Sequence, residues 1–119
     1  MIRPKELSLG NVVRYKGRIR EVLTINYNWL NLNGPLPVGL EHCEGVPITY
    51  GLLRKAGFEE ISEGEFYKAV NGHIEVFVYK DSDTEYRIGK TDADIHIKYM
   101  HELQNAYYLL TKIPLTLDV

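Results

Sequence analysis

Four basic side chains gather within seven positions near the start of the chain: Arg14, Lys16, Arg18 and Arg20. They surround Lys16-Gly17, a step typical of a turn between strands, so we predict a β-hairpin over residues 12–25. Cations grouped around an aromatic ring, here Tyr15, are typical of surfaces that bind a nucleic-acid backbone or another anion. The alternative is a solvated hairpin whose Lys and Arg side chains protect an exposed strand edge.

The register of this hairpin determines which side chains share a face. A two-residue loop would mix polar and apolar residues on both faces. A three-residue loop over residues 16–18 places Tyr15 opposite Ile19 and Arg14 opposite Arg20, which makes one face almost wholly apolar. Because a slip of one residue turns every side chain to the other face, we predict the three-residue loop. The two opposed arginines would repel each other, and a bound anion would relieve that repulsion.

Residues able to bind a metal or act as nucleophiles are present: His42, Cys43, His73, His96 and His101. His42 and Cys43 are adjacent, so they would point to opposite faces of a strand, whereas a zinc site needs three or four converging ligands. The acidic side chains form runs at expected turns, which is typical of solvated surface. The sequence also lacks the P-loop, G-x-S-x-G and H-E-x-x-H motifs. We therefore expect no metal site, no cofactor and no catalytic residue.

Aromatic side chains form a second candidate site, a surface for a protein partner. A two-residue turn at Asn71-Gly72, the strongest hairpin signal in the chain, would pair Phe66 with Phe77. Both faces of that hairpin are then largely apolar, so a helix must cover one of them. The N-terminal strands or a second copy of the protein must cover the other. We name four residues as candidate partner contacts: Phe66, Phe77, Tyr79 and Tyr108.

The elements that position these groups are short strands and two helices. Strands are expected around Trp29 and over residues 40–44, separated by a loop rich in Gly and Pro at residues 34–39. A short helix is predicted from Thr49, a suitable N-cap, to Gly57 at the C′ position. Further strands form an antiparallel meander, and we place them at residues 58–61, 65–79 and 85–88.

Residues 94–111 change their hydrophobic period from two to that of a helix, which predicts a strand followed by an amphipathic helix laid across the sheet. The apolar stripe of that helix consists of Met100, Leu103, Ala106, Tyr107 and Leu110. We expect His101 to be a surface or capping residue. Gln104 and Asn105 are expected to hydrogen-bond to neighbouring backbone or solvent. Tyr108 lies about 100° from Tyr107 around the helix axis, which makes it the exposed member of the pair.

Composition suits one globular domain over residues 1–119, with subdomains at residues 1–47 and 48–119. Hydrophobic residues make up 45% of the 119 positions and charged residues 25%. We see no secretory signal and no apolar run long enough to cross a bilayer, and Cys43 is the only cysteine, so we expect a cytoplasmic protein without a membrane partner. The net charge of −2 is uneven, because residues 1–57 carry +4 and residues 58–119 carry −6.

Three stretches of the chain also carry a family resemblance: KELSLGNVVRYKGRIREVLTI, VPITYGLLRKAGFEEI and IKYMHELQNAYYLLT. Their order and spacing resemble an uncharacterised family of small proteins of gut Bacteroidetes and their phages and mobile elements. The chain departs from the family at Tyr50 and Gly51, where members usually carry acidic residues, and at Lys112, where they often carry glycine. The resemblance implies an intracellular, phage- or element-associated role and supplies no catalytic residues.

Together these patterns predict an α+β domain. A small, bent, SH3-like N-terminal sheet is followed by a short linking helix and by an antiparallel β-meander packed by a C-terminal helix. The predicted function is a non-catalytic binding or adaptor module that contacts a protein partner or a second copy of itself as a homodimer. One alternative is a nucleic-acid-associated accessory protein that uses the basic hairpin tip, and another is an enzyme of unidentified chemistry.

Overall fold

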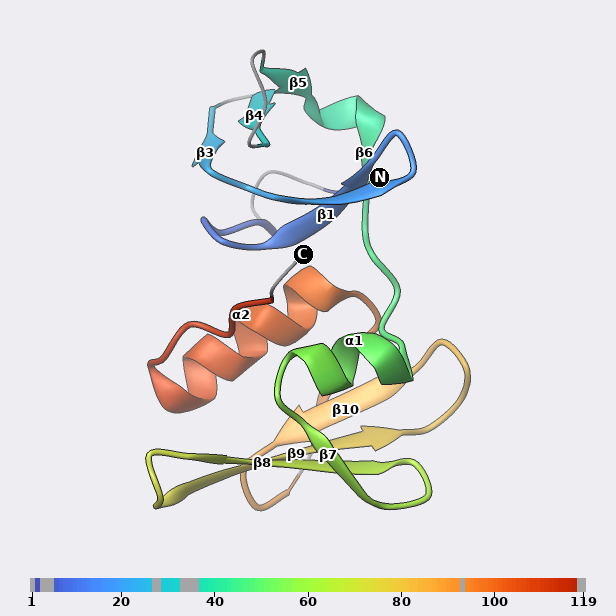
Figure 1. Cartoon of the computed structure of the whole chain (residues 1–119), viewed down its shortest axis with the longest axis vertical. Helices are drawn as coiled ribbons and strands as arrows, with labels where there is room; N and C mark the ends of the chain where they lie inside the picture. Colours follow the sequence, from blue (N-terminus) through green and yellow to red (C-terminus); the bar gives the residue numbers. More distant parts are fainter. Residues whose placement is uncertain (1, 3–5, 27–28, 33–36, 93, 118–119) are drawn as a thin grey trace.

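The structure is a computed structural model that describes residues 2, 6–26, 29–32, 37–92 and 94–117. Within these residues the chain has a mixed α+β fold with three antiparallel sheets, as the sequence predicts. Figure 1 shows three layers: the N-terminal sheets on top, helices α1 and α2 in the middle, and the five-stranded sheet below. The N-terminal strands therefore pack on the helical layer and not on the second face of the five-stranded sheet.

Two three-stranded sheets form the N-terminal unit. The first, in the order β2-β1-β6, consists of β1 (Val12–Tyr15), β2 (Arg18–Glu21) and β6 (Cys43–Glu44). The second, in the order β3-β4-β5, consists of β3 (Thr24–Ile25), β4 (Trp29–Asn31) and β5 (Val38–Gly39). They enclose a core of their own, formed by Ile2, Leu7, Val13, Val22, Leu30, Leu32, Leu40 and Cys43.

The strand predicted at residues 40–44 is only partly correct. A turn of 3₁₀-helix, η2 (Leu40–His42), occupies its first part, and the strand is confined to β6. The predicted loop at residues 34–39 ends in β5, while residues 34–36 lie outside the described part of the chain. The sequence prediction missed the 3₁₀ turn because it assumed a strand, in which every second residue is buried. Leu40 and Cys43 are instead buried at a spacing of three, which is the period of a 3₁₀ turn.

The basic hairpin closes with a two-residue turn, so the predicted three-residue loop is wrong. Tyr15 pairs with Arg18, and Arg14 pairs with Ile19. The turn is of type I′, because both of its central residues have positive φ: Lys16 at 50° and Gly17 at 75°.

Burial on both faces of β1 explains the error in register. Val12 belongs to the core beneath α2, whereas Val13 belongs to the N-terminal core. Both side chains are essentially inaccessible to solvent. The prediction assumed that one face of the hairpin is buried and the other solvated, a rule that does not hold for a strand covered on both sides.

The second half of the chain forms a five-stranded antiparallel sheet in the order β11-β10-β9-β8-β7. Its strands are β7 (Glu59–Ser62), β8 (Glu65–Val70), β9 (Ile74–Lys80), β10 (Tyr86–Gly89) and β11 (Ile95–Ile97). The two helices are α1 (Tyr50–Lys55) and α2 (Met100–Thr111). The predicted caps of α1 are confirmed, since Thr49 Oγ1 accepts a hydrogen bond from Leu52 N at 3.2 Å and Gly57 has a φ of 94°.

The β8–β9 hairpin differs from the predicted pairing by one residue. Asn71 and Gly72 form the expected turn with positive φ, but His73 stays outside the ladder and Val70 pairs with Ile74. The predicted pairing of Phe66 with Phe77 is therefore wrong. Both faces of this hairpin are apolar in sequence, so the hydrophobic pattern gave no preference between the two registers.

The observed register puts Lys68 on the inner face of the sheet. Its Nζ donates a hydrogen bond to the backbone oxygen of Ala56 at 2.9 Å and lies 5.1 Å from the ring centroid of Tyr107. Burial lowers the pKa of this lysine. The remainder of the inner face is apolar, formed by Phe66, Val70, Val76 and Val78.

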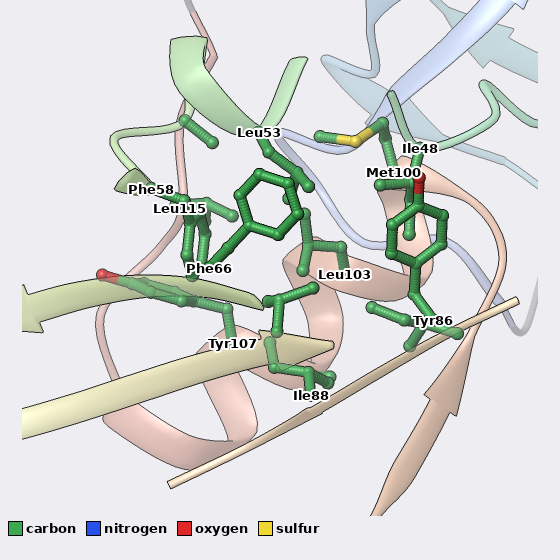
Figure 2. Close-up of a cluster of buried hydrophobic side chains, with 14 of the residues drawn as sticks. Ile48, Leu53, Phe58, Phe66, Tyr86, Ile88, Met100, Leu103, Tyr107 and Leu115 are labelled. Atoms are coloured by element: carbon green, nitrogen blue, oxygen red, sulfur yellow. The ribbon is translucent and has the colours of Figure 1, made fainter. Parts of the chain in front are cut away.

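Helix α2 is buried on two sides. Towards the sheet it presents the predicted apolar stripe, with Met100, Leu103 and Tyr107 packed against side chains of α1 and of the sheet (Figure 2). Towards the N-terminal unit it presents His101 and Gln104, which are 1% and 4% exposed. The expectation that His101 lies at the surface is therefore wrong, because it treated α2 as a helix with one buried face.

Amide side chains of α2 join the helix to the N-terminal unit. Gln104 Oε1 accepts a hydrogen bond from Val12 N at 2.8 Å, and its Nε2 donates to the backbone oxygens of Gly10 at 3.0 Å and Leu115 at 3.1 Å. Asn105 Nδ2 donates to the backbone oxygen of Glu6 at 2.8 Å. Gln104 and Asn105 thus bind backbone groups, as expected, but the expectation of neighbouring backbone is wrong, because three of these four contacts span more than 90 positions.

We expect Gln104→Ala to lower the free energy of unfolding by about 1–3 kcal/mol, because it leaves the buried Val12 N–H and backbone oxygens without their partner. Urea denaturation followed by circular dichroism measures the change. Tyr108→Ala, on the same helix but at a side chain that is 51% exposed, is the matched control and should have a much smaller effect. Equal losses in the two variants would contradict this role for Gln104.

Two glycines should respond in opposite ways to alanine. A Cβ at Gly45 would lie 2.7 Å from ring atoms of Tyr99, so we expect Gly45→Ala to lower the midpoint of thermal unfolding. A Cβ at Gly51, within α1, would meet no atom within 4 Å, so Gly51→Ala should stabilise the protein by up to about 1 kcal/mol. Calorimetry of the two variants checks both signs, and a stabilised Gly45→Ala protein would disprove the close packing of Tyr99.

Candidate partner-binding face

The outer face of the five-stranded sheet carries three aromatic side chains. Tyr67 of β8 lies directly opposite Phe77 of β9, and Tyr79 follows Phe77 two residues later, so all three project from the same face. All three are partly exposed. Figure 1 shows both helices on the inner side of this sheet and, among the described residues, no helix or strand on the outer side. We call Tyr67, Phe77, Tyr79 and Arg87 the aromatic face.

The rings of the aromatic face form a continuous row. The ring centroids of Tyr67 and Phe77 are 5.4 Å apart, and those of Phe77 and Tyr79 are 6.5 Å apart with planes inclined by 19°. The row ends at Arg87 of β10, opposite Tyr79, whose guanidinium carbon lies 5.5 Å from the centroid of the Tyr79 ring. Because the residues stand on three adjacent strands, the sheet fixes the positions from which these side chains project.

Charged groups hold the end of the row in place. Arg87 Nε donates a hydrogen bond to Asp81 Oδ2 at 2.8 Å. That hydrogen bond lowers the pKa of Asp81 and raises the pKa of Arg87, so both groups stay charged at neutral pH. Burial, together with a hydrogen bond to Glu65, raises the pKa of Tyr79 above its usual range, so its phenol stays neutral.

The aromatic face contains two of the four predicted partner contacts, Phe77 and Tyr79. Phe66 is 3% exposed and lies on the inner face, so it cannot touch a partner in this fold. Tyr108 is exposed, as expected, but it stands on α2 beside a separate groove. Sequence reasoning missed Tyr67, and the correct hairpin register would have identified it.

The groove beside Tyr108 has a volume of about 240 Å³. Its walls come from the N-terminal segment, α2 and the C-terminal segment: Ser8, Leu9, Gly10, Asn11, Gln104, Asn105, Tyr108, Pro114, Leu115 and Thr116. Gln104 and Asn105 already bind backbone groups there. The polar part of this groove therefore joins α2 to the N-terminal unit.

The observed hairpin register separates the four basic residues predicted to bind an anion. Arg18 lies opposite Tyr15 and Arg20 opposite Val13, so these two arginines share a face. Arg14 points to the other face, and Lys16 lies in the turn. The predicted opposition of Arg14 and Arg20 is thus wrong, and the mutual repulsion that suggested an anion is absent between them.

A polar hollow of about 410 Å³ includes a histidine–carboxylate pair that sequence reasoning missed. His101 Nε2 lies 3.4 Å from Glu6 Oε2, and the Tyr99 ring stacks on the imidazole with centroids 5.8 Å apart. The separation of 95 positions in sequence explains why no sequence motif revealed this pair. Because the imidazole is 1% exposed, we assign it to packing between α2 and the N-terminal unit.

Other predicted chemical groups do not converge. Burial, and secondarily Glu41, raises the pKa of the Cys43 thiol, which disfavours the reactive thiolate. Within the described residues, no three side chains of His, Cys, Asp or Glu are placed to hold a metal ion. No helix in the same part of the chain is both long enough and apolar enough to cross a bilayer.

Comparisons with models of protein families, with curated proteins and with solved structures find no match to this chain. The geometry of the aromatic face is therefore the feature that indicates a function.

We expect Glu65→Gln to bring the pKa of Tyr79 down towards its ordinary value. The substitution removes a negative charge and a carboxylate acceptor beside the phenol, while burial, the larger cause of the shift, is unchanged. NMR titration of tyrosines labelled at Cζ measures the effect, and Tyr79→Phe assigns the signal. An unchanged titration of Tyr79 in the Glu65→Gln protein would contradict the contact.

Proposed function

We propose that this protein is a non-catalytic binding module that contacts a protein partner through the aromatic face. The observation that carries the proposal is the row of Tyr67, Phe77 and Tyr79 on a sheet face that no described helix or strand covers. Aromatic side chains are enriched at protein interfaces because they bury a large area and lose little conformational entropy. Rows of this kind on a sheet face are a rigid surface for recognition.

Several finer features of the proposal come from the sequence. We propose an intracellular, cytoplasmic protein of phage or mobile-element type, on the basis of its family resemblance. We also propose that the bent N-terminal unit is SH3-like. Its two three-stranded antiparallel sheets around a shared core support that comparison.

Three alternatives have weaker support. Homodimerisation through the aromatic face would bring Glu59, Glu65 and Glu75 near the same residues of a second copy. Binding of nucleic acid by the hairpin would depend on Lys16, Arg18 and Arg20 without Arg14, which points to the other face. An enzyme would need an accessible acid or base, and the imidazole of His101 is almost completely covered.

The proposal can be tested by replacing Phe77 with a photo-crosslinking amino acid. We expect the purified protein to crosslink to a discrete protein in cell extract, and that protein, once identified and purified, should bind the wild-type chain. Binding should weaken at least tenfold in Phe77→Ser and Tyr79→Ser, because each substitution removes an aromatic contact worth about 1–2 kcal/mol or more. Thermal unfolding of these variants provides the check on folding.

Two matched positions give the outcomes that would contradict the proposal. The same crosslinker at Leu109, which is 63% exposed next to Tyr108, tests the exposed side of α2. At Arg18 it tests the basic hairpin. A partner captured at either of these positions, whose affinity is unchanged by Phe77→Ser, would show that the aromatic face is not the binding surface.

A further inference from the structure

Carboxylates border the aromatic face. Glu59 lies opposite Tyr67, Glu65 lies opposite Tyr79, and Glu75 lies opposite Ala69, so all three project from the outer side of the sheet. Asp81 adds a fourth carboxylate through its bond to Arg87. Three basic or titratable groups share the surroundings: Arg87, His96 opposite it in β11, and Lys90 beside Phe77. With Arg87 held by Asp81, the acidic groups predominate.

From this combination we infer that the partner presents an extended, arginine- or lysine-bearing protein segment, a deepening that rests on the function proposed above. Carboxylates favour a cation, and the faces of Tyr and Phe rings attract a cation within about 6 Å of their centroids. The chain itself uses this kind of contact near the sheet: Arg87 lies over Tyr79 at 5.5 Å and Lys68 over Tyr107 at 5.1 Å.

The charges select against two other occupants. Nucleic acid would bring phosphates against Glu59, Glu65 and Glu75, which repel them. A second copy that used the same face across a two-fold axis would set this mainly acidic patch against itself, because such an interface uses the same patch on both copies. A basic segment is the occupant whose charge complements the border.

The spacing of the rings favours an extended segment. Alternate side chains of a strand project from the same side at intervals of about 6.4–6.8 Å. The centroids of Phe77 and Tyr79 are 6.5 Å apart, so alternate basic side chains of a segment running along β9 would meet successive rings. A hollow of about 540 Å³ beside Phe77, lined also by His73, Ile74, Glu75, Lys90 and Thr91, extends this path past the hairpin end of β9.

The two edges of the sheet are poorer sites for such a segment than its face, and the edge strand β11 has only three residues. Edge strand β7 has only four residues, and its pairing with β8 shifts between Glu60 and Ser62. The short length and the irregular register both disfavour the addition of another strand at β7. We therefore place the basic segment across the face.

Three synthetic peptides test the inference: alternating Arg-Thr, alternating Gln-Thr and alternating Glu-Thr, all of equal length. We expect the arginine peptide to shift the NMR signals of Tyr67, Phe77 and Tyr79 and to bind more tightly than the other two. Added salt should weaken it. Replacing Glu59, Glu65 and Glu75 together by Gln should weaken binding about tenfold, since the variant loses three exposed carboxylates that attract the cations of the peptide.

The controls separate charge from folding. If the triple variant fails to fold, the single variant Glu75→Gln replaces it, because Glu75 is exposed. This variant should also weaken binding of the arginine peptide. Glu41→Gln in the N-terminal unit carries the same charge change and should leave the affinity unchanged.

The outcomes distinguish this inference from the proposed function. Three results would overturn the inference of a basic segment. They are equal binding of the glutamine or glutamate peptide, absence of binding by the arginine peptide, and NMR signal shifts confined to other surfaces. A non-basic partner crosslinked at position 77 would leave the aromatic face in use and reject only the charge of the occupant. Failure of the crosslinking experiment would instead reject the face itself.

Discussion

The side-chain amide of Gln104 joins three segments of the chain at one point on α2. It binds the backbone at Gly10, Val12 and Leu115, and it is 4% exposed. A buried amide is tolerated because its hydrogen bonds are made, and a hydrogen-bonded amide also fixes distance and orientation, which apolar packing alone does not. The N-terminal sheets therefore lie on the helix layer, and the outer face of the five-stranded sheet is left open. The aromatic face is exposed because the N-terminal unit packs on the opposite side of the molecule, where the hydrogen bonds of Gln104 hold it.

Most of the second half of the fold follows from local signals. The period of α2, the caps at Thr49 and Gly57, and the turn at Asn71-Gly72 are where the sequence predicts them. The errors concern which side of an element is buried. Val12 and Val13 are buried on opposite faces of β1, and α2 buries both Leu103 and Gln104. Local periodicity cannot reveal a second covered face, because the contact that covers it comes from a distant part of the chain.

The sequence predicted which residue types form the candidate site, but not which of them share one face of the sheet. Phe77 and Tyr79 could be named from the sequence, whereas Phe66 and Tyr67 exchanged roles because His73 adds one residue after the turn. The same sensitivity affected the basic hairpin, in which one residue of register separates Arg14 from Arg20. In both hairpins the residue types predicted which chemistry was present, and the register determined where it points.

Burial of α2 on two sides also bears on how the chain folds. Gln104 bonds backbone groups 92 and 94 positions earlier in the sequence, so α2 is synthesised long after β1, which packs on it. During synthesis, the inner face of β1 and the inner face of the five-stranded sheet must wait for this helix to cover them. Non-local contacts of this kind slow folding and lengthen the time for which apolar strands are exposed. A nascent chain that lacks α2 is thus the form of this protein most in need of a chaperone.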